Sequence, residues 1–305
     1  AFSVSLATLA PAQPISPYLV GNNLWYGRAN NATEAASSPD AQTIGLVSET
    51  GTRFVRIGGI NYESGERDRN GNVTALPNDA VYEVWVRRIR EAGAEPLVQV
   101  SRFRAPRVDR TLDATVAAAR ARETVRYLNK EKNLNVRYWS IGNEPFGTSG
   151  TPSDSQIADY AALFREVAAA MKAEDPSILI YGISNAWYDP VVYDRLLGAN
   201  DDIYDISGPI PGTSGRLFHL DGVTWHSYPP TAANPVINAI RTMRIFTWSM
   251  LEDLQRVNNR ADRVAAGQFV GWGIGEFNSR NAAEVRRFEN GQMLAAVYGL
   301  AMHHG

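Results

Sequence analysis

Short apolar runs rich in β-branched residues alternate along this chain with longer segments in which apolar residues recur every three to four positions. The first pattern predicts buried strands and the second predicts amphipathic helices. Strands are expected at Tyr18–Leu24, Arg53–Ile57, Pro96–Val100, Arg137–Ile141, Ile178–Gly182, Gly222–His226 and Val270–Gly275. Helices are expected at Ala80–Glu91, Asp113–Asn129, Ser155–Ala173, Ile237–Val257 and about Glu284–Met302. This alternation predicts an α/β fold, and seven strands with crossover helices favour a (β/α)₈ barrel over an open sheet.

Both ends of the chain depart from a complete barrel. After the seventh strand only one helical segment follows, and no residues remain for an eighth strand before Gly305. At the other end, Phe2–Leu6 reads as a short alternating strand with no partner. We therefore expect residues 1–12 to belong to an accessory β-domain and residues 13–305 to form a barrel that is incomplete at its C-terminus. A further chain or domain would supply strand eight and a β-sandwich.

Composition excludes several classes of protein. The 305 residues carry 30 basic and 32 acidic side chains, which gives no electrostatic reason to expect nucleic acid or an anionic membrane as a partner. The absence of cysteine excludes disulfides, thiolate metal sites and thiol nucleophiles. No apolar run approaches the roughly 20 residues that span a bilayer. The chain begins at Ala1, as a mature secreted protein does, so an extracellular or periplasmic location is expected.

The segment Arg137–Pro145 carries the first candidate site. Its apolar strand ends at Gly142, and Asn143 and Glu144 follow at the carboxyl end, where the functional groups of a barrel collect. A carboxylic acid that is partly shielded from water there can stay protonated and donate to a leaving oxygen. Asn143 could bind a sugar hydroxyl beside the reacting carbon. The alternative without a functional role is that Asn-Glu-Pro forms only a structural turn.

The segment Val270–Phe277 carries the second candidate site, because another short strand ends in a carboxylate, Glu276. Strands four and seven face one another across a barrel mouth, so Glu144 and Glu276 could flank one glycosidic bond. A pair that acts with retention of configuration lies about 5–5.5 Å apart, whereas an inverting pair lies about 6.5–9.5 Å apart. The sequence itself does not contain this distance.

Ile141–Pro145 together with Gly275–Phe277 resembles clan A of the glycoside hydrolases. The resemblance implies a retaining enzyme that needs no metal or cofactor, with Glu144 as general acid/base and Glu276 as nucleophile. Pro14–Gly21 and Val55–Gly59 resemble a subset of the clan that contains β-xylosidases, arabinofuranosidases, heparanase-like glucuronidases and certain endoglucanases. In this subset a β-sandwich built from both chain ends accompanies the barrel. The resemblance stops before strand eight, which puts the activity of the isolated chain in question.

Further residues at expected strand ends fit a sugar cleft. His226 or Tyr228, after strand six, could hydrogen-bond Glu276 and keep it ionised, and by the resemblance Arg56 would support the same charge. A structural histidine, or an arginine paired with another acid, is the alternative. Six further residues are candidates for stacking on sugar rings or binding sugar hydroxyls: Trp25, Tyr26, Asn61, Tyr62, Trp187 and Trp272. We expect two or three of them to line the cleft and the others to pack in the protein interior.

The sequence lacks the motifs of phosphate-binding, serine-hydrolase and metal sites. Gly271–Gly275 has no lysine followed by Ser or Thr and so is not a phosphate loop, and no Gly-x-Ser-x-Gly elbow is present. The four histidines do not form a helix-spaced metal motif. The expected partner is an oligo- or polysaccharide, most simply a β-linked plant or microbial glycan. Two alternatives stay open: a non-catalytic glycan-binding barrel or one chain of a two-chain hydrolase, and, more remotely, a lyase.

Overall fold

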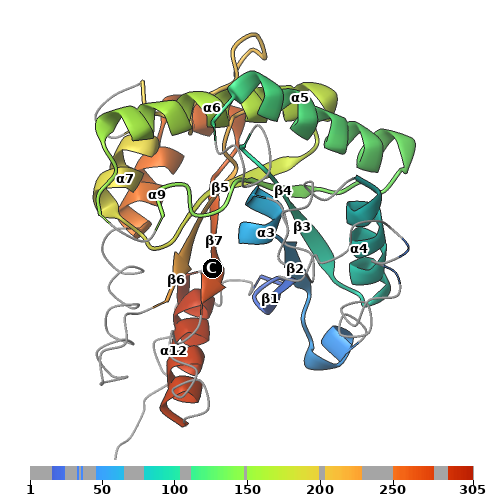
Figure 1. Ribbon diagram of the computed structural model, residues 1–305. Coiled ribbons are helices and arrows are strands. Elements are labelled where there is room, and N and C mark those ends of the chain that lie inside the picture. Colours follow the sequence, from blue (N-terminus) through green and yellow to red (C-terminus); the bar gives the residue numbers. More distant parts are fainter. Residues whose placement is uncertain are drawn as a thin grey trace, which may run out of the picture.

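A computed structural model gives the fold of the chain (Figure 1). It describes residues 16–24, 33, 36, 46–64, 79–103, 111–147, 150–198, 203–228, 250–277 and 288–304. Seven strands lie in one sheet in chain order, and each pairs in parallel with the next. They are β1 (Gly21–Leu24), β2 (Phe54–Ile57), β3 (Glu95–Val100), β4 (Tyr138–Ile141), β5 (Leu179–Asn185), β6 (Gly222–Ser227) and β7 (Gly271–Phe277).

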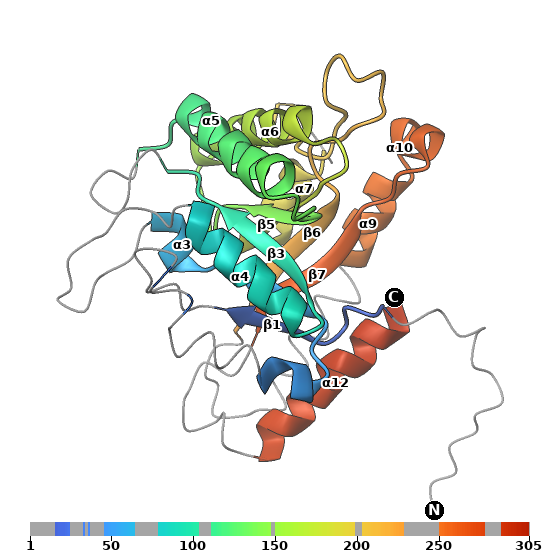
Figure 2. The same cartoon turned by 90° about the vertical axis from the view of Figure 1, so that its right-hand side faces the viewer.

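Helices connect the strands and lie outside the sheet, which curls into a barrel that lacks an eighth strand (Figures 1 and 2). The crossover direction that places these helices is the usual one for parallel strands. The helical elements are η1 (Ser48–Thr50), α3 (Ile60–Ser64), α4 (Asp79–Glu91), α5 (Ala114–Val125), the π-helical turn η2 (Arg126–Glu131), α6 (Asp154–Glu174), α7 (Pro190–Leu196), α9 (Met250–Asn258), α10 (Ala261–Ala266) and α12 (Phe288–His304).

Apolar spacing explains how the helices attach to the sheet. In α4, Val81, Trp85 and Ile89 recur every four residues and are all buried, so one stripe of the helix faces the strands. The inner strands β2 to β6 are largely buried on both faces, as β4 shows with four buried residues in succession, whereas β7 is only half-buried. The helix α6 begins with a capping box, in which the side chains of Ser153 and Gln156 each bond to the other's backbone N–H. The core therefore lies between the barrel wall and its helices.

All seven expected strands are present, and most of the expected helices are as well. The helix expected at Asp113–Asn129 is divided into α5 and η2, which form one continuous helical segment. Within the segment expected at Ile237–Val257, α9 begins at Met250, and residues 237–249 lie outside the described residues. The expected strand Phe2–Leu6 also lies outside them. Three short helices, α3, α7 and α10, were not expected, since segments of five to seven residues give little periodic signal.

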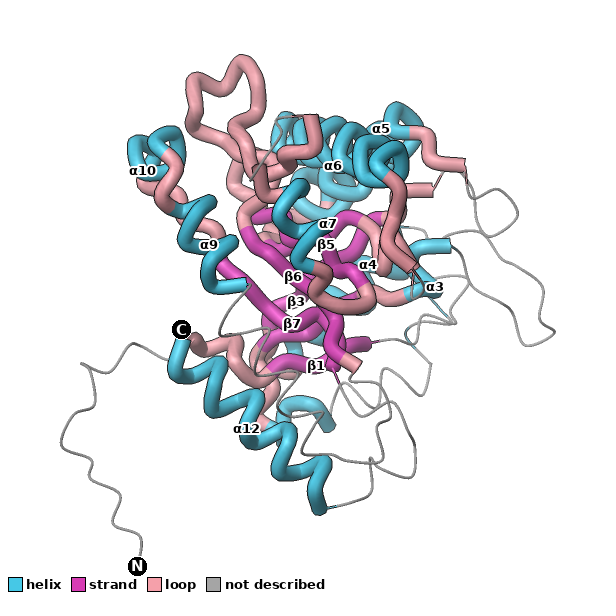
Figure 3. Tube along the Cα trace, turned by 90° about the vertical axis from the view of Figure 1, so that its left-hand side faces the viewer, coloured by secondary structure: helices cyan, strands magenta, loops and turns pink. Residues whose placement is uncertain are grey.

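The last helix returns toward the barrel. Phe277, at the end of β7, meets Tyr298 of α12 edge to face with ring centroids 5.9 Å apart, and Val297 is buried. Figures 2 and 3 show α12 beneath the barrel on the β1 side. Across the described part of the chain, every helix is either too short or too polar to pass through a lipid bilayer.

Candidate active site

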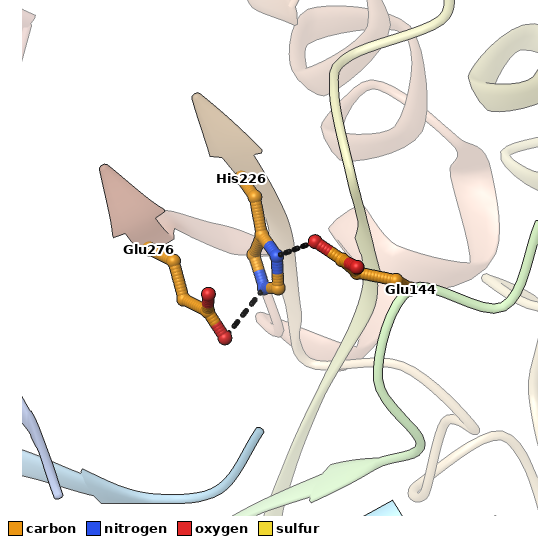
Figure 4. A group of neighbouring side chains, drawn as sticks. All are labelled: Glu144, His226 and Glu276. Carbon is orange, nitrogen blue, oxygen red and sulfur yellow. Dashed lines mark hydrogen bonds and ion pairs between the residues drawn. The ribbon is translucent and has the colours of Figure 1, made fainter. Parts of the chain in front are cut away.

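The two candidate carboxylates meet at the carboxyl ends of the strands. Glu144 follows β4, Glu276 is the second-last residue of β7, and His226 of β6 lies between them (Figure 4). One carboxylate oxygen of Glu144 and one of Glu276 lie within 4.8 Å of each other. The side chains are 26% and 12% exposed, so both are partly shielded and both can be reached from solvent. The parallel register explains the meeting, because it brings the carboxyl ends of all strands to one rim.

Glu276 is held at both carboxylate oxygens. Arg56 Nη1 lies 2.5 Å from Oε1 in an ion pair, and the Tyr228 hydroxyl donates to Oε2 over 2.9 Å. Burial by itself raises the pKa of Glu276, but the charges of His226 and Arg56 and the hydrogen bonds from Arg56 and Tyr228 outweigh it, so the pKa lies below its ordinary value. Glu276 is therefore ionised at neutral pH, as a nucleophile must be.

Arg56 is fixed by two neighbours besides Glu276. Its Nη2 donates to Gln99 Oε1 and to Asn143 Oδ1, each over 2.8 Å. Gln99 in turn bonds the backbone of Gly59 through both ends of its amide. Arg56 thus contacts the Glu276 carboxylate, as predicted, and its role in a reaction stays a prediction. Asn143 is 4% exposed, and its side-chain oxygen accepts from Arg56. Gln99 was missed, although a lone polar residue inside the apolar run Pro96–Val100 was the signal for it.

His226 contacts both carboxylates and is closer to Glu144. Its Nδ1 lies 3.0 Å from Glu144 Oε1, and its Nε2 lies 3.7 Å from Glu276 Oε1 (Figure 4). The sequence predicted that His226 or Tyr228 hydrogen-bonds Glu276; the Tyr228 hydroxyl makes that bond, and His226 bonds Glu144. On the β6–β7 ladder the register shifts between Trp225 and His226, and His226 pairs with Glu276.

The backbone around Glu144 is unusual. Gly142 has φ +77° and Glu144 has φ +44°, a left-handed conformation that a side chain with a Cβ rarely adopts. The Glu144 N–H donates to the Ser184 carbonyl of β5 over 2.9 Å, and the Gly142 N–H donates to Val100 of β3 over 2.9 Å. Contacts to both neighbouring strands therefore hold this turn, and non-glycine residues in such conformations are frequent at functional sites.

A pocket of about 460 Å³ opens beside Glu144. Its wall contains aromatic and apolar side chains together with buried charges, among them Phe103, Phe146, Tyr160, Glu63 and Arg102. Neither Glu276 nor Arg56 lines it. Mixed walls of this kind suit a polar ligand with apolar faces.

Several expected binding residues do not reach the site. Tyr62 is fully buried and packs against Tyr82, with ring centroids 5.7 Å apart, so it belongs to the core. Trp272 lies four residues before Glu276, near the start of β7, and stacks on Trp225 at 5.9 Å. Trp187 follows β5 at the correct rim and is partly exposed, so it stays a prediction. Three further predictions cannot be judged, because Trp25, Tyr26 and the side chain of Asn61 lie outside what the structure describes.

The trio could in principle hold a cation. Glu144, His226 and Glu276 each offer one ligand atom, all within 4.8 Å of one another. However, Arg56 and Tyr228 already occupy the two oxygens of Glu276. A cation would have to compete with a guanidinium at 2.5 Å, so the donor set suits an ion-pair network better than a metal centre.

Solved structures of similar fold are all longer than this chain. A family 51 α-L-arabinofuranosidase from Bifidobacterium longum matches with TM-score 0.57 and 16% identity over 90% of this chain and 58% of that one. A GH39 β-xylosidase from Caulobacter crescentus matches with TM-score 0.55 and 16% identity over 96% and 62%. A bifunctional glucanase-xylanase from a metagenome library matches with TM-score 0.57 and 15% identity over 96% and 72%.

The chain thus spans less than two thirds of the first two of these proteins. No family model matches the sequence, and no curated protein matches it at a significant level. At this level of identity the likeness concerns the fold, which is the (β/α)₈ barrel without its eighth strand.

Proposed function

We propose that this chain is the barrel of a retaining glycoside hydrolase of clan A, with Glu276 as nucleophile and Glu144 as general acid/base. One observation carries the proposal: carboxylate oxygens of these two residues lie within 4.8 Å of each other at one rim of the barrel. This separation is closer to the roughly 5–5.5 Å of retaining pairs than to the roughly 6.5–9.5 Å of inverting pairs. The fold shared with several glycosidases supports the assignment.

The reaction would proceed in two displacements. A Glu276 oxygen attacks the anomeric carbon and forms a glycosyl ester, while the bond to the leaving oxygen breaks and Glu144 gives that oxygen its proton. Glu144, now a carboxylate, takes a proton from water. The water oxygen attacks the anomeric carbon, the ester bond breaks and Glu276 regains its charge. After the second displacement both glutamates are back in their starting protonation states, and the overall balance involves only the glycoside and water.

The surrounding residues would support these steps. Arg56 and Tyr228 stabilise the carboxylate that attacks and later leaves, through contacts of 2.5 and 2.9 Å to its two oxygens. His226, 3.0 Å from Glu144 and 3.7 Å from Glu276, fixes the position of the proton donor relative to the nucleophile. Asn143 and Gln99 hold Arg56 in place.

The proposed substrate is a β-linked or arabinofuranosyl glycan. The similar structures include proteins described as an α-L-arabinofuranosidase, a β-xylosidase and a glucanase-xylanase, which is why these sugars are the first to try. We further propose that a C-terminal chain or domain supplies strand eight and, with residues 1–12, a β-sandwich. Secretion follows from a polymeric substrate and belongs to the same proposal.

Azide rescue tests the two roles separately. A panel of 4-nitrophenyl β-xyloside, α-L-arabinofuranoside, β-glucoside and β-mannoside first identifies the sugar. Glu276→Gly should abolish turnover, and added azide should yield a glycosyl azide of inverted configuration. Glu144→Ala with azide should yield the azide of retained configuration, because the glycosyl ester still forms. Variants at either position that keep near-normal rates would show that the assignment is wrong.

A glycan-binding barrel without activity is the second candidate. The edges of β1 and β7 have no ladder partner among the described residues, and an unclosed barrel can lack catalytic precision. If the wild-type chain retains polysaccharide on affinity gels but releases no reducing ends, this candidate is favoured. Mass spectrometry of the native material would detect a second polypeptide. Unsaturated products seen by NMR would indicate a lyase instead.

A further inference from the structure

A buried ion pair lies under the turn that carries Glu144. Glu63, in α3 after β2, and Arg102, directly after β3, approach to 2.5 Å between Oε1 and Nε. Their side chains are only 1% and 9% exposed. The proposed reaction assigns no step to either residue. The pair therefore needs an explanation of its own.

The arginine supports the turn by packing. A Cβ built on Gly142 would come within 3.0 Å of Arg102 Cδ and 3.3 Å of its Nε, so the arginine stem lies directly on the Gly142 backbone. Gly142 has φ +77° and is also tied to Val100 by its N–H. With Arg102 on one side and β3 on the other, Gly142 has little freedom to move.

The glutamate supports the same turn through its pair with Arg102. Burial raises the pKa of Glu63, while the charge of Arg102 acts in the opposite direction. The buried Glu63 carboxylate thus holds the arginine whose stem lies on Gly142, two residues before Glu144. Helix α3 is itself fastened to β3, since the Ser101 hydroxyl donates to the Glu63 carbonyl.

A buried ion pair is a poor way to gain stability, because removing two charges from water offsets most of their attraction. Such a pair can instead restrict geometry, because each charged side chain holds the other in position and both restrict the backbone that they contact. Here Arg102 lies on Gly142, two residues before a glutamate in a left-handed conformation. Such a conformation persists only where the surroundings hold it.

We propose that the Glu63–Arg102 pair is a positioning device for the proton donor Glu144, acting by clamping the Gly142 backbone. The proposal rests on the proposed glycosidase function and adds residues to its machinery. Neither member touches the reacting atoms. Both also line the pocket beside Glu144, so the clamp and the wall that faces the departing group are one structure.

The dependence of rate on the leaving group provides the test. Cleavage of a phenyl glycoside needs a proton from Glu144, whereas 2,4-dinitrophenolate departs almost without protonation. Only the rate of phenyl glycoside cleavage therefore depends on the position of the acid. Using the sugar that the panel identifies, Glu63→Gln should lower kcat/KM for the phenyl glycoside by about 10- to 100-fold. For the dinitrophenyl glycoside the change should stay below about threefold. Glu144→Ala provides the reference for complete loss of the acid.

A second buried pair supplies the matched control. Lys172 and Asp221 lie 2.6 Å apart with side chains 3% and 9% exposed, and Asp221 accepts from the Ile180 N–H near the opposite end of the sheet. Asp221→Asn should destabilise the protein and leave the ratio of the two kcat/KM values as in the wild type. If Glu63→Gln does not fold, Arg102→Lys keeps the charge but loses the Nε that pairs with Glu63, and it is measured in the same way.

The possible results distinguish a failure of this inference from a failure of the proposed glycosidase function. If the wild type cleaves no glycoside, the proposed function fails and this inference falls with it. If the wild type is active and Glu144→Ala shows the selective loss, but the Glu63 and Arg102 variants change both substrates equally or neither, the inference alone is wrong. A selective loss for the phenyl glycoside in either variant, absent in Asp221→Asn, supports it.

Discussion

At the scale of single residues, the ionisation of Glu276 is decided by opposing effects close to its carboxylate. Burial favours the protonated acid, while His226, Arg56 and Tyr228 favour the anion and prevail. The pKa of Glu276 therefore lies below its ordinary value, so the anion that the mechanism needs persists into mildly acidic solution. Arg56 can have this effect because Gln99 and Asn143 hold its other nitrogen.

Replacing Arg56 by methionine should raise the pKa of Glu276. The acid limb of the kcat/KM profile should then move to higher pH, because a larger share of the free protein carries protonated Glu276 at a given acidic pH. At neutral pH kcat/KM should fall by about 100-fold, the usual effect of losing one electrostatic partner of a reacting oxygen. The measurement is kcat/KM from pH 3 to pH 9.

Arg87→Met is the control for that profile. Arg87 lies on α4, its side chain is 50% exposed, and it pairs with Glu83 at 2.8 Å on the helix surface. Exposed pairs of this kind contribute little, so both limbs of the profile should stay where they are. An unchanged acid limb in Arg56→Met would contradict the account given for Glu276.

At the scale of elements, the close packing of β5 against β6 depends on a glycine, Gly222, which has no side chain. Tyr181 of β5 covers Gly222 of β6 so closely that a Cβ there would lie 2.1 Å from the ring. The ring cannot easily withdraw, since it also meets Tyr138 of β4 edge to face at 6.0 Å. Gly222 is thus required by packing between strands rather than by its backbone conformation.

Gly222→Ala should lower the free energy of unfolding by about 1–3 kcal/mol through overpacking. Gly273→Ala in β7 is the matched control, because a Cβ there would meet Thr224 at an ordinary 3.9 Å. The control should leave stability unchanged or raise it by up to about 1 kcal/mol, through the lower entropy of the unfolded chain. Urea denaturation of both variants measures the difference, and equal effects would refute the packing argument.

At the scale of the whole molecule, the parallel barrel brings distant residues to one rim. Arg56, Gln99, Glu144, His226 and Glu276 come from or follow five different strands, β2, β3, β4, β6 and β7. Arg56 and Tyr228 contact the two carboxylate oxygens of Glu276. A carboxylate that is already held at both oxygens is a poor ligand for a cation.

Prolonged dialysis against EDTA should therefore leave kcat and KM unchanged, within about 20%. The comparison is with the same protein dialysed against buffer and then supplied with Zn²⁺, Mg²⁺ or Ca²⁺. Loss of activity with EDTA that one of these ions restores would mean that the Glu144, His226 and Glu276 oxygens and nitrogens serve as metal ligands after all.

The sequence by itself determined the elements and the two main acids. Apolar runs and helical periodicity depend on local spacing, so they located all seven strands, and the rule that functional groups follow barrel strands singled out Glu144 and Glu276. Arg56 was identified as a candidate site residue from the family resemblance.

Only the tertiary structure decided which side chains touch. Tyr62 and Trp272 are aromatic, as sugar-binding residues often are, but Tyr62 of α3 is buried in the core and the partly buried Trp272 of β7 stacks on Trp225. The partners of His226, Gln99 and the Glu63–Arg102 pair depend on contacts between strands far apart in the chain, and a one-residue shift in register changes such contacts. Spacing along a chain determines which face of an element a residue occupies, whereas distances between elements arise only when those faces pack.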